Sequence, residues 1–297
     1  MGILRILLGL VMLQGWAWAT GVTLNFTNSG AQNNLKSDLT PLGADTFVEI
    51  GAFTPGFTPT ALNRASWAVN WTALKRVRFD AVFGFFDGAA NLLNNNSPFL
   101  TTNNVWVWVY DGSGQWCVYG RDTWKWPDAN SFFPPTGIGY TPSQANIAVA
   151  GSVSSTTPRL VCEQVTDAAS PSVSYADWAT LWGLPAGSAG KAQDADKDGR
   201  SNLYEYALGG LPMDARPDPS VVSILPYGGQ PHLAAKISRG WVTGVTYTVQ
   251  WSENLTNWFT TGLTTVANTP PLLEVRDADP VGTADRRFLR VLVSSPD

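Results

Sequence analysis

Short runs of apolar residues, separated by turn residues, dominate the first half of the chain. Branched and aromatic residues cluster at 22–26, at 47–50 and at 76–86, with Asn, Gly and Pro between the runs. Runs of this length, without long helical periods, are typical of antiparallel strands. Residues 20–165 are therefore predicted to form an all-β domain, either a β-sandwich or a jelly roll.

The clearest pattern lies at 105–119. From 105 to 110, valine occupies every odd position and an aromatic residue every even one, so both faces of this strand are hydrophobic. Asp-Gly-Ser-Gly at 111–114 is a turn, and a second apolar run returns at 116–119. We predict an inner β-hairpin with both of its faces covered.

Residues 166–217 interrupt the β-pattern. A linker rich in Ala, Ser and Pro leads to Ser174, a candidate helix N-cap, and apolar residues then recur at helical spacing up to Trp182. A second helix is expected to begin near Ser201 and to end at Gly209. This segment is predicted to be a short helix–loop–helix joint.

The β-pattern resumes near residue 218. Strands are expected at 221–225, 232–237, 245–251, 272–275 and 288–293. About 80 residues of this kind suit a sandwich of the immunoglobulin or fibronectin type. We therefore predict an immunoglobulin-like module over 218–297, and a chain that is mainly β.

The first residues have the pattern of an export signal. Arg5 precedes the apolar run 6–13, and Ala-Trp-Ala at 17–19 matches the A-x-A cleavage pattern. Residues 1–19 are predicted to be a signal peptide, and no later stretch is apolar over the ~20 residues that cross a bilayer. We expect a secreted, extracellular or cell-surface protein, with the periplasm as the alternative location.

The charge of the chain argues against one class of partner, and its cysteine content allows one disulfide. Charged residues make up 14% of the chain, the net charge is −4, and no basic cluster is present, which argues against a nucleic-acid partner. The chain has two cysteines, Cys117 and Cys162. They are predicted to form a disulfide, because an exported chain meets an oxidising environment.

The twelve residues 194–205 place oxygen-bearing side chains at alternating positions. They read D-A-D-K-D-G-R-S-N-L-Y-E, with aspartates at loop positions one, three and five and glycine at position six. Calcium takes roughly six to eight oxygen ligands, and this is the ligand spacing of an EF-hand loop. The predicted ligands are Asp194, Asp196, Asp198, Arg200 through its carbonyl, Asn202 and Glu205.

The loop resembles the calcium loops of type I dockerins and of thrombospondin type 3 repeats. The wider run 196–212 is similar to a segment that precedes a β-sandwich module near the C-termini of large secreted bacterial proteins. The resemblance implies the same calcium ligands, with an immunoglobulin-like module after the loop. Ser201 stands where EF-hands have an aliphatic residue, and the chain has no second loop. Both departures favour a static structural site over a cohesin-binding dockerin or a calcium sensor.

Residues suited to catalysis are scarce. His232 is the only histidine, it lies at the start of a strand expected at the surface, and the chain has no G-x-S-x-G motif. A glycoside hydrolase needs only two carboxylates. The candidates are Asp80, Asp87, Asp111, Asp122 and Asp128. Most have Gly, Asn or Pro beside them, which favours a role in turns.

Three tryptophans suggest a different use of the N-terminal domain. Trp116, Trp124 and Trp126 lie around a short loop and would present flat faces to a sugar if they were exposed. The alternative is that they pack in the core, as most large aromatic side chains do.

The sequence favours a calcium-binding, non-catalytic structural, adhesive or binding protein that is secreted or held at the cell surface. Calcium would make the joint between the two β-modules rigid. The first alternative is a carbohydrate-binding protein that uses tryptophans of the N-terminal domain. The second is a carboxylate-based glycoside hydrolase. The expected partner is a glycan or protein of the cell surface or matrix.

Overall fold

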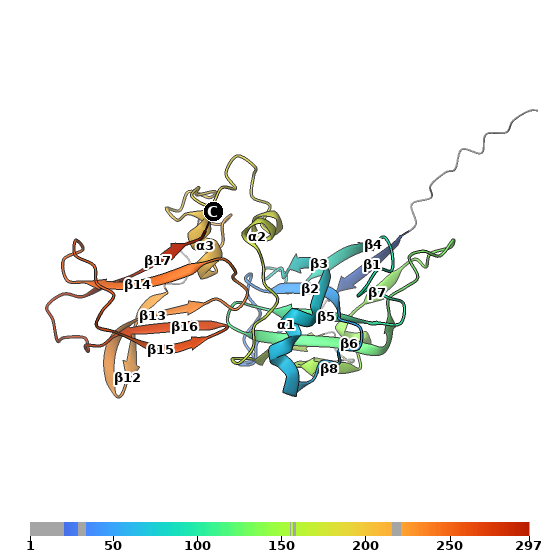
Figure 1. Cartoon of the computed structure of the whole chain (residues 1–297), viewed down its shortest axis with the longest axis horizontal. Coiled ribbons are helices and arrows are strands. Elements are labelled where there is room, and N and C mark those ends of the chain that lie inside the picture. Colours follow the sequence, from blue (N-terminus) through green and yellow to red (C-terminus); the bar gives the residue numbers. More distant parts are fainter. Residues whose placement is uncertain (1–20, 29–33, 155, 157–158, 216–220, 297) are drawn as a thin grey trace, which may run out of the picture.

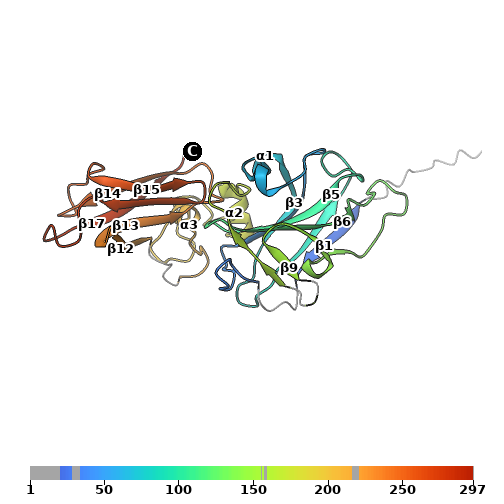
Figure 2. The same ribbon diagram turned by 90° about the horizontal axis from the view of Figure 1, so that it is seen from below.

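The computed structural model describes residues 21–28, 34–154, 156, 159–215 and 221–296. The signal peptide predicted over 1–19 lies outside these residues. The chain is mainly β, as predicted, and two β-rich parts lie on either side of the helices α2 and α3 (Figure 1, Figure 2). In the described part of the chain, no helix has the length and apolar character needed to cross a membrane.

The N-terminal part contains eleven strands among the described residues. They are β1 (Val22–Thr27), β2 (Phe47–Phe53), β3 (Trp71–Arg78), β4 (Asp87–Leu92), β5 (Asn104–Tyr110), β6 (Gln115–Lys125), β7 (Ile138–Tyr140), β8 (Ile147–Ala150), β9 (Ser152–Ser154), β10 (Arg159–Val161) and β11 (Glu163–Gln164). The short helices in this part are η1 (Ala61–Ser66), α1 (Trp67–Asn70) and η2 (Pro142–Gln144).

Two sheets face each other in this part. The larger has the order β11-β6-β5-β2-β3, with β8 paired to β6, and the smaller has the order β4-β1-β7. Leu24 and Phe26 of β1, Ile50 of β2 and Val107 of β5 are fully buried in one cluster between them. An apolar layer enclosed by two sheets is the core of a β-sandwich, which confirms the predicted fold class.

The other face of the larger sheet is buried as well. The three valines of β5 belong to the sandwich core, whereas its three aromatic residues belong to a second cluster. We call this second cluster the aromatic core. Its largest members are Phe47, Phe53, Trp67, Trp106, Trp108, Tyr110, Trp116, Trp178, Tyr206 and Trp241. The predicted inner hairpin with two covered faces is therefore confirmed.

The joint consists of α2 (Tyr175–Leu181) and α3 (Asn202–Leu208), with the loop between them. Ser174 caps α2 by accepting a hydrogen bond from the N–H of Asp177, at 3.1 Å. Gly209 ends α3 in the left-handed conformation. Both helix boundaries agree with the sequence prediction, because capping residues specify helix ends locally.

The C-terminal part is a second, smaller sandwich. Its strands are β12 (Val222–Tyr227), β13 (Gln230–Ser238), β14 (Thr246–Ser252), β15 (Leu263–Thr269), β16 (Leu272–Asp277) and β17 (Phe288–Ser294). They form a sheet of order β12-β13-β16-β15 and a pair β14-β17. Ala235, Ile237, Val249, Val275 and Val291 fill the core between them.

Two strand predictions need correction. The run 76–86 is not one strand: β3 ends at Arg78, and the carboxylate of Asp80 accepts hydrogen bonds from the N–H groups of Val82 and Phe83, which closes a turn. The strand β15 was missed, because its Leu-Thr-Thr-Val-Ala-Asn-Thr sequence is mostly polar and half exposed.

Trp241 connects the two β-rich parts. Its ring meets Phe47 of β2 edge to face, with centroids 5.2 Å apart, and lies 5.6 Å from Tyr206 of α3. The turn between β5 and β6 approaches closely enough that a Cβ on Gly112 would lie 2.8 Å from the indole nitrogen of Trp241. The N–H of Gly240 donates to the carbonyl of Gly112 at 2.8 Å. The two parts are thus joined by packed aromatic rings and by backbone hydrogen bonds.

We expect Trp241→Ala to lower the free energy of unfolding by about 3–5 kcal/mol, the usual cost of deleting a large buried ring. Trp241 is 3% exposed, whereas Phe133, the matched control, is 82% exposed and should tolerate alanine with little change. Denaturant unfolding measured by tryptophan fluorescence checks the prediction. Equal stability of the two variants would show that Trp241 does not hold the parts together.

Candidate metal centre

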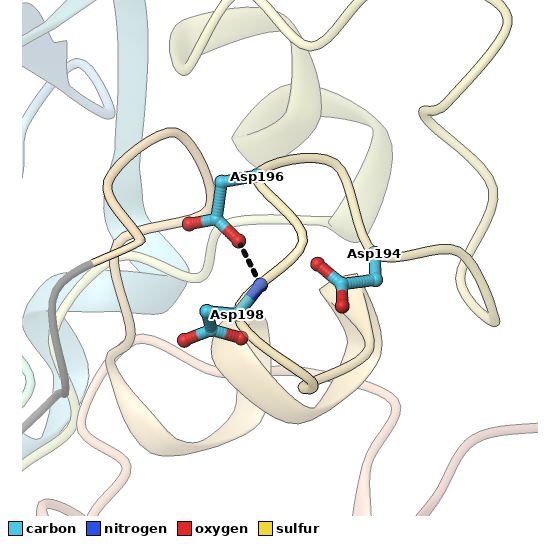
Figure 3. Close-up of side chains that lie close together, drawn as sticks. All are labelled: Asp194, Asp196 and Asp198. Carbon is cyan, nitrogen blue, oxygen red and sulfur yellow. Dashed lines mark hydrogen bonds between the residues drawn. The ribbon is translucent and has the colours of Figure 1, made fainter.

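The structure brings three of the predicted calcium ligands together. One carboxylate oxygen from each of Asp194, Asp196 and Asp198 lies within 4.8 Å of the others (Figure 3). All three side chains come from the loop between α2 and α3 and are partly buried. A centre surrounded by several carboxylate oxygens has the chemistry that calcium prefers.

Backbone N–H groups of the loop hold these carboxylates in place. Asp194 accepts hydrogen bonds from Lys197 at 2.7 Å and from Gly199 at 2.8 Å. Asp196 accepts from the N–H of Asp198 at 3.2 Å, and Asp198 accepts from the N–H of Arg200 at 2.8 Å. A carboxylate has about four acceptor positions, so these bonds leave room for a cation.

The backbone of the loop takes the conformations that this convergence requires. Gly199, at position six, has a φ of +96°, which only glycine adopts without strain. Lys197, at position four, has a φ of +66°, a left-handed conformation that costs a non-glycine residue about 1–2 kcal/mol. The convergence of the aspartates therefore requires a backbone conformation that is unfavourable at Lys197.

The electrostatics of the cluster suit a cation. Burial raises the pKa of Asp196, and the charges of Asp198 and Asp194 raise it further, although a hydrogen bond from the N–H of Asp198 lowers it. Its Oδ2 atom is buried and has no hydrogen-bond partner among the described residues. A buried carboxylate oxygen beside two other acids is stabilised by a positive ion. The residues present therefore fit calcium.

Asn202, also predicted as a calcium ligand, makes several structural hydrogen bonds. Its side chain is fully buried, and its amide nitrogen donates to the carbonyls of Ser188 at 2.7 Å and Gly190 at 2.9 Å. Its Oδ1 accepts from the N–H of Ala195 at 3.3 Å. The backbone N–H of Asn202 also donates to the carbonyl of Gln193, at 2.7 Å. Asn202 therefore closes the loop and holds its two ends together.

The other two predicted ligands, Glu205 and Arg200, are not among the three converging carboxylates. Glu205 is 1% exposed in α3, and it does not belong to the group of carboxylates that converge within 4.8 Å. Its charge acts on the neighbouring α2: burial raises the pKa of Tyr175, and Glu205 raises it further. The guanidinium of Arg200 lies 3.9 Å from the carboxylate of Asp198. This contact places positive charge beside the cluster.

The three tryptophans proposed as a sugar-binding surface are buried. Trp116 stacks against Trp67 in the aromatic core, with centroids 5.8 Å apart. Trp124 packs edge to face on Tyr140 at 5.0 Å, and the indole of Trp126 donates to the carbonyl of Asn104. None of the three offers a free face to a ligand, because each ring is more favourable in the core than in water.

The disulfide predicted between Cys117 and Cys162 is not formed in the structure. Both residues are free thiols, and both are buried in the sandwich core. The Cys117 sulfur instead approaches the carbonyl of Ser152 at 3.7 Å. The prediction used only the number of cysteines and the expected compartment, and neither determines how two side chains meet.

Most of the residues considered for catalysis make hydrogen bonds to the backbone. His232 is 5% exposed, which corrects the expected surface position, and its Nδ1 lies 2.9 Å from the carbonyl of Asp277. Four of the five candidate carboxylates accept hydrogen bonds from backbone N–H groups one to four residues ahead: Asp80, Asp111, Asp122 and Asp128. This is the turn chemistry that the sequence indicated.

A comparison of the chain with protein-family models gives no match, and a comparison with curated proteins gives none either.

Sequence reasoning missed the residues that surround the loop. Tyr175 of α2 donates its hydroxyl proton to the carbonyl of Ala189 at 2.9 Å, and Lys191 reaches the hydroxyl of Ser295 at 3.0 Å. Both contacts fasten the approach to the loop. The helical stripe predicted for 175–182 placed Tyr175 on the apolar face of the helix, where it is partly buried, but no sequence pattern indicated its backbone partner.

We expect Asn202→Asp to separate a scaffold role from a ligand role. The substitution keeps an oxygen for calcium but removes the two amide N–H donors, which should lower the free energy of unfolding in calcium-free buffer by about 1–3 kcal/mol. Denaturant titration in the presence of a chelator measures this. The exposed Asn257→Asp is the control. Unchanged stability together with tighter calcium binding would return Asn202 to the ligand set.

Proposed function

We propose that this is a secreted or cell-surface protein with a structural or adhesive, non-catalytic role, in which calcium makes the joint between two β-sandwiches rigid. The observation that carries the proposal is the convergence of Asp194, Asp196 and Asp198 on one centre. The proposed ion is calcium, held by these three carboxylates, by the carbonyl of Arg200 and by Glu205.

Repulsion among the carboxylates explains why an ion would order this loop. Two like charges about 4 Å apart repel by several kcal/mol near a protein surface. Lys197 and Arg200 are the cations of the loop, and Lys197 is exposed to solvent, which weakens its effect on the cluster. A divalent cation at the centre changes this repulsion into attraction.

The helix α3 contacts both β-rich parts: Tyr206 packs in the aromatic core with residues of the first sandwich, and hydrogen bonds join α3 to the second. Tyr206 of α3 hydrogen-bonds to the carbonyls of Val173 and Thr243, the latter at 2.9 Å. Tyr247 of β14 also donates to the carbonyl of Ala207 of α3, at 2.8 Å. A loop that fixes the start of α3 therefore also fixes a helix that contacts both neighbours.

The non-catalytic part of the proposal rests on the described acids and the single histidine. Their side chains close turns or contact backbone carbonyls, as given above for Asp80, Asp111 and His232. General acid–base catalysis needs a group placed to exchange a proton with a substrate. A hydrolase activity lost in His232→Ala, with the fold intact, would contradict this part.

We expect calorimetry with calcium chloride to find one site with a dissociation constant of about 10⁻⁴–10⁻³ M, the range of extracellular calcium modules. Asp196→Asn removes one charge from the cluster at almost constant volume and should weaken binding at least tenfold. Asp285→Asn, in an exposed loop of the C-terminal part, should bind as the parent does. No heat of binding at millimolar calcium would exclude the ion from this role.

Limited proteolysis should show where calcium acts. Without calcium, trypsin is expected to cut after Lys191 or Lys197, because the loop backbone opens when its carboxylates repel each other. The two products should separate on a denaturing gel but elute together in gel filtration, since the aromatic core still joins them. Asp196→Asn should be cut at the calcium-free rate in either buffer. Equal cutting of the parent protein with and without calcium would contradict the proposal.

A further inference from the structure

The strand β3 is an open edge of the larger sheet. It lies last in the sheet order and pairs with β2 alone among the described strands. The N–H of Phe79 donates to the carbonyl of Thr46 at 2.9 Å. In an antiparallel pair, every second residue directs its backbone N–H and C=O toward the partner strand, and the residues between direct theirs away from it. The backbone N–H and C=O groups of Arg76 and Arg78 therefore point away from β2.

A groove runs beside this edge. A cavity of ≈ 860 Å³ lies along the second half of β3, and one of ≈ 390 Å³ lies along its first half. Both cavities are lined by Lys75, Arg76, Thr180 and Leu181. They form one groove, with β3 as one wall and α2 as the other, and Figure 1 shows α2 beside this margin of the sheet.

Two cations in the groove lack an acidic partner. Arg76 is matched by the buried Glu49 and by Asp177, whose carboxylate lies 3.7 Å away. Within the described chain, Lys75 and Arg78 have no carboxylate within 4.0 Å. Arg78 lies over the ring of Trp182 at 3.6 Å, and its Nε donates to the carbonyl of Leu181.

Burial of Arg78 is unfavourable without a partner anion. Desolvation lowers its pKa, and the charge of Asp80 offsets only part of this effect. Asp80, Asp87 and Asp214 also line the larger cavity, beyond the end of β3. The positive charge is therefore concentrated along β3 itself, at 75–78.

We propose that the β3 edge binds an extended acidic segment of a partner protein, which adds to the sheet as a further strand. Arg76 and Arg78 offer outward backbone groups about 7 Å apart, the two-residue repeat of a strand, and a peptide backbone supplies matching donors and acceptors. Lys75 and Arg78 supply the charge complementarity, one on each face of the strand. The inference is independent of calcium, because the loop is not part of the groove.

Charged residues on an edge strand also serve to prevent aggregation. That role needs only exposed charge. It does not require a groove beside the strand or a half-buried arginine stacked on a tryptophan. These two features favour a binding edge, and the experiment below distinguishes the two roles.

The probe is a fluorescein-labelled nine-residue peptide that repeats Val-Glu-Glu, because these repeats place glutamates on both faces of an added strand. We expect saturable binding by fluorescence polarisation, and at least tenfold weaker binding to Lys75→Glu and to Arg78→Gln. Lys236→Glu is the matched control, because Lys236 is an exposed lysine on a strand paired on both sides, and it should change affinity less than twofold. Because Lys75 is exposed, Lys75→Glu should fold normally, and it tests the proposal even if Arg78→Gln does not fold.

Two further measurements test strand addition itself. Bound peptide should slow amide hydrogen exchange at Arg76 and Arg78, and methylation of alternate peptide nitrogens should abolish binding. The proposal is overturned by no binding at millimolar peptide, or by equal binding of a peptide with lysine in place of glutamate. It is also overturned by equal binding of the methylated peptide, or by a dimer of the protein that Lys75→Glu dissociates, which would assign the edge to a second copy.

Discussion

The structure depends on one constraint: neither face of the central strand β5 reaches water. Its valines fill the sandwich core and its aromatic residues fill the aromatic core on the opposite face. Exposing rings of this size would cost several kcal/mol, so other segments must cover them. Trp67 of α1, Trp178 of α2, Tyr206 of α3 and Trp241 provide the cover. The joint and the second sandwich are therefore packed against the first by the same residues that complete its sheet.

A buried ion pair fixes the orientation of the joint on this surface. Glu49 is fully buried in β2, where it accepts the hydroxyl proton of Tyr110 at 2.7 Å and pairs with Arg76. The other side of the guanidinium donates to the carbonyl of Ser172 at 3.0 Å and lies near Asp177 at the start of α2. Removing one partner of such a pair costs about 3–5 kcal/mol, because the other charge stays buried. Apolar packing alone would hold α2 against the sheet but would not fix its orientation as closely as these hydrogen bonds and ion pairs do.

Features that depend on neighbouring residues were predicted correctly, whereas contacts between residues far apart in the chain were not. The two-residue alternation of β5, the N-cap Ser174 and the terminal Gly209 all depend on neighbours in the chain, and all were predicted from it. The stack of Arg78 on Trp182 joins residues about a hundred positions apart, which no periodicity encodes. In the loop, the spacing of the aspartates predicted their convergence. The same spacing did not reveal that the amide nitrogen of Asn202 donates to the carbonyls of Ser188 and Gly190.

The magnitudes decide what calcium can and cannot do in this joint. At a concentration tenfold above its dissociation constant, an ion stabilises the folded state by about 1.4 kcal/mol. Deleting a single ring of the aromatic core costs about 3–5 kcal/mol, and Trp241, Tyr206 and Trp178 all belong to that core. The rings therefore hold the two sandwiches together whether or not the ion is bound. Bound calcium would add rigidity to this joint at the loop before α3, where the carboxylates converge and Lys197 is held in a left-handed conformation. A calcium ion of this affinity would make an already packed joint more rigid, which suits the proposed static structural role better than a switch.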